Sequence, residues 1–415
     1  MTVSRRRLLE ATGGGALGLL LGAGGGYALG DQHGQNASTS TVPFFGRHQA
    51  GIITPAQDRL AFASFDLTLE SRSDLRDLLR TWSEAAERLT AGKLLGPEVE
   101  PPEQPPADTG EAEGLPPSDL TVTFGLGPDV FEKDGADRYG LRARRPRALT
   151  PLGPLPGEVL IPSLSNGDLC VQACAADPVV AFHAIRTLAR AGRGAAVLRW
   201  TQIGFGRTSS TTRSQVTERN LMGFKDGTNN LRGDDDGQMR RYVWVGDEEP
   251  QRWFRDGTYL VSRRIRMRIE AWDRDSLSDQ ERVIGRFKQS GAPLTGSHEH
   301  DVVKLDATMA DGLPVIDVAA HIRLAAASQN HDLRLLRRGY SFADGIDPTT
   351  SELDAGLFFL AFQRNPHTQF AALQRRLGTT DALNEYILHT TSGLFAIPPG
   401  TSQGSFVGSG LFERA

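Results

Sequence analysis

The sequence predicts an α+β protein with two ferredoxin-like β-α-β-β-α-β units that pack sheet to sheet, as in a dimeric α+β barrel. The first half has this order of strand and helix patterns, and a similar set follows from residue 258 onward. A short motif also recurs, as Asp177-Pro178-x-x-x-Phe182 and Asn365-Pro366-x-x-x-Phe370. Asp or Asn before Pro is a frequent helix start, so both units are expected to begin a helix at this place.

The first unit is predicted from its apolar spacing. Leucine, tryptophan and alanine side chains recur at helical intervals between Leu75 and Leu89, with Ser73 as the expected N-cap. A second helix is expected from Val179 to Leu188. The predicted strands are 61–67, 120–124, 169–175 and 195–203.

The second unit is predicted in the same way, but with longer gaps. A long strand is expected at 259–272 and a helix at 276–287. A helix at 367–377 is expected to follow a buried strand. The remaining predicted strands are 339–342, 357–363 and 393–397.

Two segments exceed what these units need. Residues 96–118 hold seven prolines and six acidic residues, which predicts a mobile surface loop. The stretch between Phe287 and Gly339 is an insertion with two histidine-containing motifs, and long insertions in compact domains often carry function. The predicted organisation is a leader at 1–28, an N-terminal segment at 29–47, and domains at 48–215 and 216–415.

Composition excludes several classes of protein. The chain has 415 residues, of which 39% are hydrophobic, so it can build a core. Its 46 basic and 50 acidic residues give a net charge of −4, without the basic excess of a nucleic-acid-binding protein. Two cysteines, Cys170 and Cys174, exclude a disulfide scaffold and a four-thiolate metal site. On a strand their Cα atoms would be roughly 13 Å apart, too far for a disulfide, so both are predicted to be buried thiols.

The leader has the pattern of an export signal. Ser4-Arg5-Arg6-Arg7-Leu8-Leu9 precedes an uncharged Gly/Ala/Leu stretch and a small-residue site near Ala28. The pair Arg5-Arg6 resembles a twin-arginine signal, which predicts delivery to the periplasm, the cell surface or the medium. A transmembrane anchor is the alternative, because the stretch is long enough, but its many glycines make it weakly apolar.

One candidate site motif is the turn-rich segment from Gly223 to Asn229. Asp226 stands beside Gly227 and three residues after Gly223, so the glycines could let a flat ligand lie against the backbone. Phe224 and Thr228 belong to the same candidate cofactor-binding segment. The alternative is an ordinary Asp-Gly turn without a ligand.

A second candidate set lies in and after the insertion. His321 is either a core histidine bonded to a backbone carbonyl or an axial ligand of haem iron. Arg337 and Arg338 enter a predicted strand, where they need anionic partners such as carboxylates or peroxide. Arginines alternate along the strand at 259–272, and Arg264 is expected to reach cofactor carboxylates. His298-Glu299-His300 could bind a metal ion, but in a polar loop we expect it to be solvated.

These motifs together resemble those of the dye-decolourising (DyP-type) peroxidases, and more closely their exported, deferrochelatase-like branch. The resemblance covers nearly the whole chain after the leader. Its five blocks are Gly46–Ile52, Asn220–Thr228, His321–Ala325, Leu336–Ser341 and Asp381–Tyr386. The resemblance implies two ferredoxin-like domains, with one haem b per chain in the C-terminal one.

The resemblance also assigns roles to residues. Asp226 and Arg337 match the distal aspartate and arginine, and His321 matches the proximal iron ligand. The family often has Asp at the position of Asn365, where it supports the proximal histidine, so this support is in question and Asn365 is expected to be a helix cap. His331 lies where many members have an Asn-Pro-Arg segment and is a rival iron ligand.

The function implied by the resemblance is a peroxidase that reduces hydrogen peroxide and oxidises dye-like or phenolic compounds by single electrons. Tyr340, Trp253 and Trp272 are candidates for relaying electrons, although core packing is the expected role of each. The alternatives are a deferrochelatase-type protein that extracts iron from haem, with partners in iron uptake, and an exported binding protein without haem. Monomer and homodimer both stay open.

Overall fold

The computed structural model describes residues 38–97 and 102–413, and residues 38–415 form one compact unit. The predicted leader at 1–28 and the first part of the N-terminal segment at 29–47 lie outside the described residues. Within the described ranges, no helix is both long and apolar enough to cross a membrane.

The first half has the predicted β-α-β-β-α-β order. Its elements are β1 (Arg59–Leu67), α1 (Arg72–Thr90), β2 (Thr121–Leu126), β3 (Leu169–Ala175), α2 (Pro178–Ala191) and β4 (Ala196–Arg207). The strands pair in the order β4-β1-β3-β2. Asp177 caps α2 as predicted, but the cap of α1 is Ser71 rather than Ser73, because the Ser71 side chain accepts the N–H of Asp74.

The second half repeats this arrangement with additional short elements. Its strands pair in the order β7-β8-β5-β10, the counterpart of the order in the first half. The strands are β5 (Thr258–Met267), β6 (Leu336–Arg337), β7 (Tyr340–Ile346), β8 (Leu353–Gln363), β9 (Ile387–His389) and β10 (Gly393–Ile397). The α-helices are α3 (Asp236–Tyr242), α4 (Ile269–Trp272), α5 (Leu277–Ile284), α6 (His321–Ala325) and α7 (Ala372–Thr380).

In two predicted elements of this half, part of the segment has a different secondary structure. The strand expected at 259–272 ends at Met267, and the chain turns into α4, where the Trp272 indole donates to the Met222 carbonyl over 3.0 Å. The helix expected at 367–377 begins with a π-helical turn, His367–Ala371, before α7. A burial pattern alone does not distinguish the end of a strand from a short helix that continues the same apolar surface.

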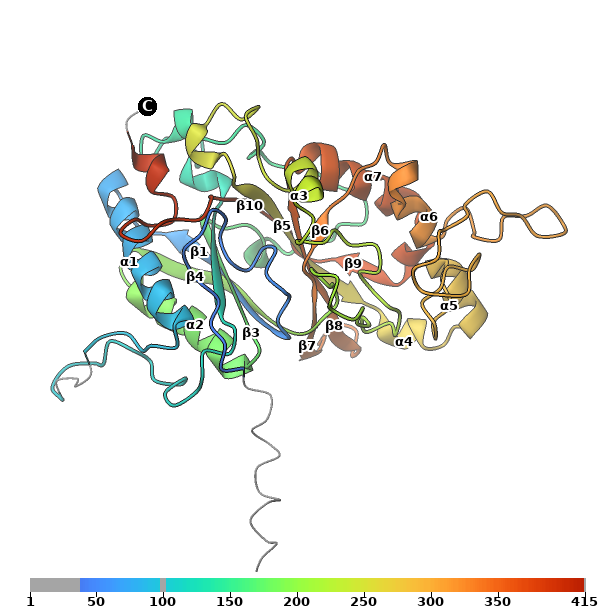
Figure 1. Cartoon of the computed structure of the whole chain (residues 1–415), viewed down its shortest axis with the longest axis horizontal. Coiled ribbons are helices and arrows are strands. Elements are labelled where there is room, and N and C mark those ends of the chain that lie inside the picture. Colours follow the sequence, from blue (N-terminus) through green and yellow to red (C-terminus); the bar gives the residue numbers. More distant parts are fainter. Residues whose placement is uncertain (1–37, 98–101, 414–415) are drawn as a thin grey trace, which may run out of the picture. The chain divides into compact units, whose positions relative to one another are not determined.

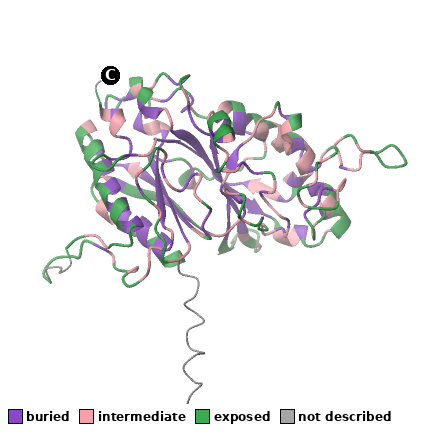
Figure 2. Ribbon diagram, viewed as in Figure 1, coloured by how far each residue is buried: buried purple, intermediate pink, exposed green. Residues whose placement is uncertain are grey.

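The two sheets join at both edges. β4 pairs with β7 and β2 pairs with β10, so eight strands close into a ring (Figure 1). The short strands β6 and β9 pair with β8 and β5, respectively. Side chains that point into the ring form one apolar cluster, which includes Phe62, Phe358 and the free thiols of Cys170 and Cys174. Figure 2 shows the strands as the most buried part of the unit, with exposed surfaces on the helices. The expected buried thiols are therefore confirmed.

Each outer face of the ring is covered separately. α1 and α2 cover the sheet of the first half, whereas α4, α5, α6 and α7 lie over the second half (Figure 1). A small apolar cluster fills the space under this second group of helices, with members Met222, Phe224, Ile265, Met267, Trp272, Val283, Ile284, Leu357, Leu383 and Tyr386. The second half therefore has its own apolar space between the sheet and the covering helices, separate from the core of the first half.

The proline-rich loop at 96–118 contacts α2 in its described part. Glu111 Oε2 lies 3.0 Å from Nδ1 of the buried His183, and Asp108 Oδ1 lies 3.4 Å from its Nε2. The Asp108 carboxylate also accepts the Leu95 N–H over 2.8 Å. Residues 108–111 are therefore anchored, and the expected mobility of the loop stays a prediction.

Candidate functional site

Two predicted site residues from distant parts of the chain form an ion pair. Arg337 Nη1 donates to Asp226 Oδ1 over 2.7 Å, and both side chains are mostly buried. The Asp226 backbone N–H donates to the carbonyl of Glu218, which holds the start of the Asp-Gly turn. The structure therefore brings the predicted distal carboxylate and distal guanidinium into direct contact.

The strand arrangement decides which of the two neighbouring arginines reaches this site. Arg337 pairs with Ala361 of β8, and Asn230 bonds both its backbone N–H and its carbonyl, each over 2.8 Å. Arg338 points the other way, is fully buried, and donates to the carbonyl of Thr54 over 2.6 Å. Successive strand side chains face opposite sides, so only Arg337 is available to the site.

The glycines of the motif are required by the backbone. Gly223 has φ +82° and Gly227 has φ +86°, in the left-handed region. A Cβ on Gly227 would lie 3.0 Å from the Cα of Ser209. The turn therefore packs tightly against residues 208–210, and this packing fixes where Asp226 stands.

Phe224 and Thr228, predicted to bind the cofactor, hold the motif to its surroundings. The Phe224 ring is 2% exposed and packs edge-on against Trp272. The Thr228 hydroxyl donates to Glu299 Oε1 over 3.0 Å. Both contacts support the loop that carries Asp226.

His321 is the first residue of α6, and its imidazole is oriented by a carboxylate. Nδ1 lies 2.6 Å from Oδ2 of Asp381, whose other oxygen accepts the Leu383 N–H over 2.9 Å. The Asp381 side chain is 3% exposed, whereas 36% of the His321 side chain is exposed. Since Asp381 occupies Nδ1, Nε2 is the nitrogen that remains for a metal.

The charges around His321 also connect it to the distal pair. Burial lowers the pKa of His321, but the charge and hydrogen bond of Asp381 raise it, and the net pKa is raised. Asp226 raises this pKa further and Arg337 lowers it, because both charges lie near the ring. His321, Asp226 and Arg337 therefore belong to one site.

Asp381 is the functional residue that sequence reasoning missed. Its block was part of the resemblance, but it lies 60 residues from His321, and no local pattern links the two. Asn365 is a helix cap, as expected, because its Oδ1 accepts the N–H groups of His367 and Thr368 over 3.0 and 3.2 Å. The hydrogen-bond partner of His321 is therefore Asp381 and not the residue at position 365.

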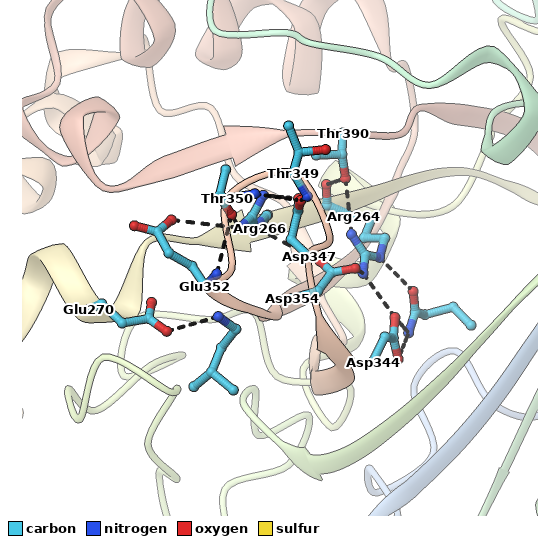
Figure 3. A network of polar contacts seen from close by, with 12 residues as sticks. Arg264, Arg266, Glu270, Asp344, Asp347, Thr349, Thr350, Glu352, Asp354 and Thr390 are labelled. Carbon is cyan, nitrogen blue, oxygen red and sulfur yellow. Dashed lines mark hydrogen bonds and ion pairs between the residues drawn. The ribbon is translucent and has the colours of Figure 1, made fainter.

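Arg264, predicted to bind the cofactor, has other partners. Its Nη2 lies 2.9 Å from Asp344 and 2.8 Å from Asp354, and its Nε donates to Gln202 over 3.0 Å (Figure 3). The next residue, Ile265, belongs to the apolar cluster of the site, so Arg264 faces the opposite side of β5. Its guanidinium therefore bridges β7 and β8, which carry Asp344 and Asp354, and β4, which carries Gln202.

The histidine motif of the insertion is only partly solvated. His298 and His300 are exposed, as expected, but the Glu299 side chain is 13% exposed and contacts Lys225 and Thr228. Burial raises the pKa of Glu299, but hydrogen bonds from Lys225, Thr217 and Thr228 lower it by more, and its net pKa is lowered. No cluster of three His, Cys, Asp or Glu suited to a metal ion occurs in the part of the chain that the structure describes.

The remaining candidates lie elsewhere. His331 is exposed and lines a cleft that does not include His321. Tyr340 is in the cluster inside the ring, Trp253 packs with Phe131, and Trp272 packs with Phe224, which agrees with core packing for all three.

The donor set fits a haem. An imidazole with its Nδ1 held by a carboxylate is the arrangement that makes Nε2 a good axial iron ligand. The Asp226–Arg337 pair supplies a carboxylate and a cation near it, and the aromatic and aliphatic cluster under α4 and α5 supplies an apolar wall. The observation that carries this fit is the Asp381–His321 contact.

Comparison with known proteins gives a consistent result. The family models "Dyp-type peroxidase, N-terminal" and "Dyp-type peroxidase, C-terminal" match residues 49–206 and 217–402. The protein named deferrochelatase from Escherichia coli (strain K12) is 35% identical over 421 residues, which cover 99% of this chain and 97% of that protein.

Solved structures show the same likeness. DtpA from Streptomyces lividans, solved as an oxyferrous complex, is 40% identical with a TM-score of 0.82, covering 91% of this chain and 99% of that chain. A DyP-type peroxidase from Cellulomonas bogoriensis is 39% identical with a TM-score of 0.80, at the same coverage of both chains.

Proposed function

Because this chain belongs to the DyP-type peroxidase family, we propose that it is a haem-dependent peroxidase that reduces hydrogen peroxide and oxidises dye-like or phenolic compounds by single electrons. The observation that carries this function is the placement of the Asp226–Arg337 ion pair in one site with the His321–Asp381 pair.

His321 would hold the haem iron through Nε2. When bound, haem supplies the redox-active iron at which peroxide is reduced. Asp381 accepts the Nδ1 proton in a hydrogen bond, which fixes the ring orientation and makes the imidazole a stronger donor. The Ala382 N–H donates to the carbonyl of Ala319 over 3.0 Å, so the turn with Asp381 and the start of α6 are held together.

Asp226 and Arg337 would have separate tasks in the reaction with peroxide. Heterolysis of peroxide needs a proton to leave one oxygen and reach the other, and a carboxylate can carry it. Among the described residues, the one hydrogen-bond contact of Asp226 Oδ2 is a long one, 3.5 Å, with Asn220, so this oxygen is available for the proton. Arg337 uses Nη1 for Asp226, and its other N–H groups can stabilise an anionic peroxide.

The direct test is peroxide-dependent oxidation of an anthraquinone dye by the haem-loaded protein. We expect turnover in the parent protein, and its loss in His321→Ala together with most of the haem. His298→Ala is the matched control, because its side chain is 86% exposed and outside the site. Full turnover and an unchanged Soret band in His321→Ala would reject the assignment of the iron ligand.

A deferrochelatase role is the second candidate, favoured by the 35% identity to proteins of that name over 99% of this chain. In that role the protein would release iron from haem and leave the porphyrin intact. Incubating the haem-loaded protein under reducing conditions and measuring protoporphyrin fluorescence distinguishes the two. Fluorescent porphyrin that accumulates without peroxide would support iron extraction, and its absence with active dye oxidation would support the peroxidase.

We also propose export by the twin-arginine route to the periplasm, the cell surface or the medium. The support is the Arg5-Arg6 pair with the following uncharged stretch. This route transports folded proteins, so the chain would be able to cross the membrane with its cofactor in place.

A further inference from the structure

Arg263 is a fully buried arginine on the face of β5 that carries the candidate site. It pairs with Phe359 of β8, whose ring packs against the apolar cluster under α4 and α5. Ile265, the next residue on the same face of the strand, belongs to that cluster, and so does Phe224 of the Asp-Gly motif. Arg263 therefore lies on the side of the sheet where the haem site is proposed, opposite to Arg264.

The partners of Arg263 use only one of its three guanidinium nitrogens. Nη1 lies 2.6 Å from Oε1 of Glu158 and donates to Oγ of Ser392 over 2.8 Å. The other oxygen of Glu158 accepts the Leu155 N–H over 2.9 Å, so it is engaged with the backbone. Nε and Nη2 of Arg263 are both buried and have no hydrogen-bond partner among the described residues. One whole edge of the guanidinium is therefore unpaired.

The unpaired edge has the geometry that a carboxylate requires. The N–H groups of Nε and Nη2 point in parallel, and such a fork matches the two oxygens of one carboxylate. Buried polar groups in folded proteins are nearly always hydrogen-bonded, so this edge indicates a partner that the chain itself does not supply. Arg338 is also fully buried, but its Nη1 and Nη2 donate to Thr54 and Gln57. Of the arginines that the structure describes, Arg263 alone has two buried nitrogens without a partner.

We infer that the free edge of Arg263 binds a carboxylate of the haem and thereby anchors the cofactor. A b-type haem carries two propionate groups, and a buried guanidinium binds such a group without competition from bulk water. The Phe370 ring lies 5.6 Å from Cζ of Arg263 and covers a face of the guanidinium, which leaves the edge free for bonds in its plane. Arg263 thus takes the role expected of Arg264, whose partners are Asp344 and Asp354. The inference rests on the proposed function, because it needs haem as the cofactor.

The test compares protein loaded with ferric protohaem IX and protein loaded with its dimethyl ester, which lacks both carboxylates. The Soret band reports how fast each porphyrin leaves for an excess of apomyoglobin, without peroxide. We expect the parent protein to release the ester at least about tenfold faster, because a hydrogen-bonded charge contributes about that factor. Arg263→Met removes the donors and should lower this ratio of rates by about tenfold. Arg264→Met, on the opposite face, should keep the ratio, since a general loss of stability speeds both releases and cancels.

A double variant controls for the ion pair, because Arg263→Met alone leaves Glu158 buried without its cation. Arg263→Met/Glu158→Gln removes both charges and should show the same low ratio, whereas Glu158→Gln alone should keep the ratio of the parent protein. A parent-like ratio in both Arg263 variants would overturn the inference and assign the free edge to water. Equal release of the two porphyrins from the parent protein would also overturn it, while haem binding would stand. A parent protein that holds neither porphyrin would instead reject the proposed function, and this inference with it.

Discussion

Arg337 and Asp226 share a hydrogen bond of 2.7 Å although they are 111 residues apart in the sequence. Each side chain is therefore positioned by the other, and each keeps unused polar atoms for a substrate. The carboxylate keeps Oδ2, and the guanidinium keeps donors besides Nη1. The chemistry of the two residues can be separated by substitution.

Asp226→Asn and Arg337→Leu should both slow the reaction with peroxide, the second more severely. Loss of a general acid–base group costs about 10²–10⁴ in rate, and loss of an electrostatic donor about 10²–10³. We still expect the larger loss with Arg337→Leu, because water can replace a proton carrier but not a buried positive charge. Stopped-flow recording of the Soret band after mixing with peroxide measures both rates. A parent-like rate in Arg337→Leu with no reaction in Asp226→Asn would reverse the two roles.

Asp381→Ala should weaken haem binding by about 10–100-fold, as is usual when the hydrogen-bond partner of a ligating histidine is removed. Asn365→Ala should leave haem affinity unchanged and lower the free energy of unfolding by about 1 kcal/mol, because Asn365 only caps a helix. Haem titration of the apoproteins and thermal unfolding give both quantities. The assignment of Asp381 fails if Asn365→Ala loses haem and Asp381→Ala does not.

Gly227→Ala should destabilise the protein and reduce dye oxidation. A left-handed backbone costs an L-residue about 1–2 kcal/mol, and the new Cβ would also press on the Ser209 backbone. Gly404→Ala is the control, since Gly404 has φ +84° but nothing within 4 Å of its Cβ position. Melting temperatures should fall for both variants and further for Gly227→Ala. Identical melting temperatures for the two variants would mean that the turn at Gly227 accommodates the new methyl group without additional destabilisation.

Acid should destabilise the protein through His389. Burial lowers the pKa of His389 to about 3, and the charge of Arg263 lowers it as well. The unfolded chain binds a proton at this residue below about pH 6.5, whereas the folded chain does not. The free energy of unfolding therefore falls by about 1.4 kcal/mol per pH unit as the pH decreases from about 6.5 toward 3.

The variant His389→Gln keeps a polar side chain beside Gln374 and removes the titrating ring. Its melting temperature should change less than that of the parent protein between pH 7 and pH 5. His298→Gln, at an exposed histidine, should follow the parent. If His389→Gln lost as much stability in acid as the parent protein, the acid destabilisation would have to come from groups other than His389.

Replacing Arg5 and Arg6 by lysine should keep the precursor in the cytoplasm, because the twin-arginine receptor recognises this pair. Fractionation followed by immunoblotting measures the distribution. Replacing Arg7 by lysine, next to the pair, is the matched control and should leave export intact. Normal export of the double variant would point to another route.

Most of the fold could be predicted because its signals are local. Helical and alternating apolar spacing is set by neighbouring residues, and it located the β-α-β-β-α-β elements of the first half within a few positions. The errors came where competing local options were equally apolar, as at the end of β5, or where two serines could cap one helix, as at α1. The small strands β6 and β9 were missed because two or three residues carry no periodicity.

The sequence by itself determined the chemical types at the site. His321, Asp226 and Arg337 stand in motifs whose residue order identifies them, and the glycines at 223 and 227 indicate a tight turn by their spacing around Asp226. Tertiary structure decided which groups meet. Three contacts depend on strand register and on how the two sheets close into a ring. Asp381 pairs with His321, Arg337 faces the site from β6, and Arg264 forms ion pairs with Asp344 and Asp354. Contacts across 60 or more residues follow from this closure, because hydrogen bonds between strands, and not local preferences, set which faces come together.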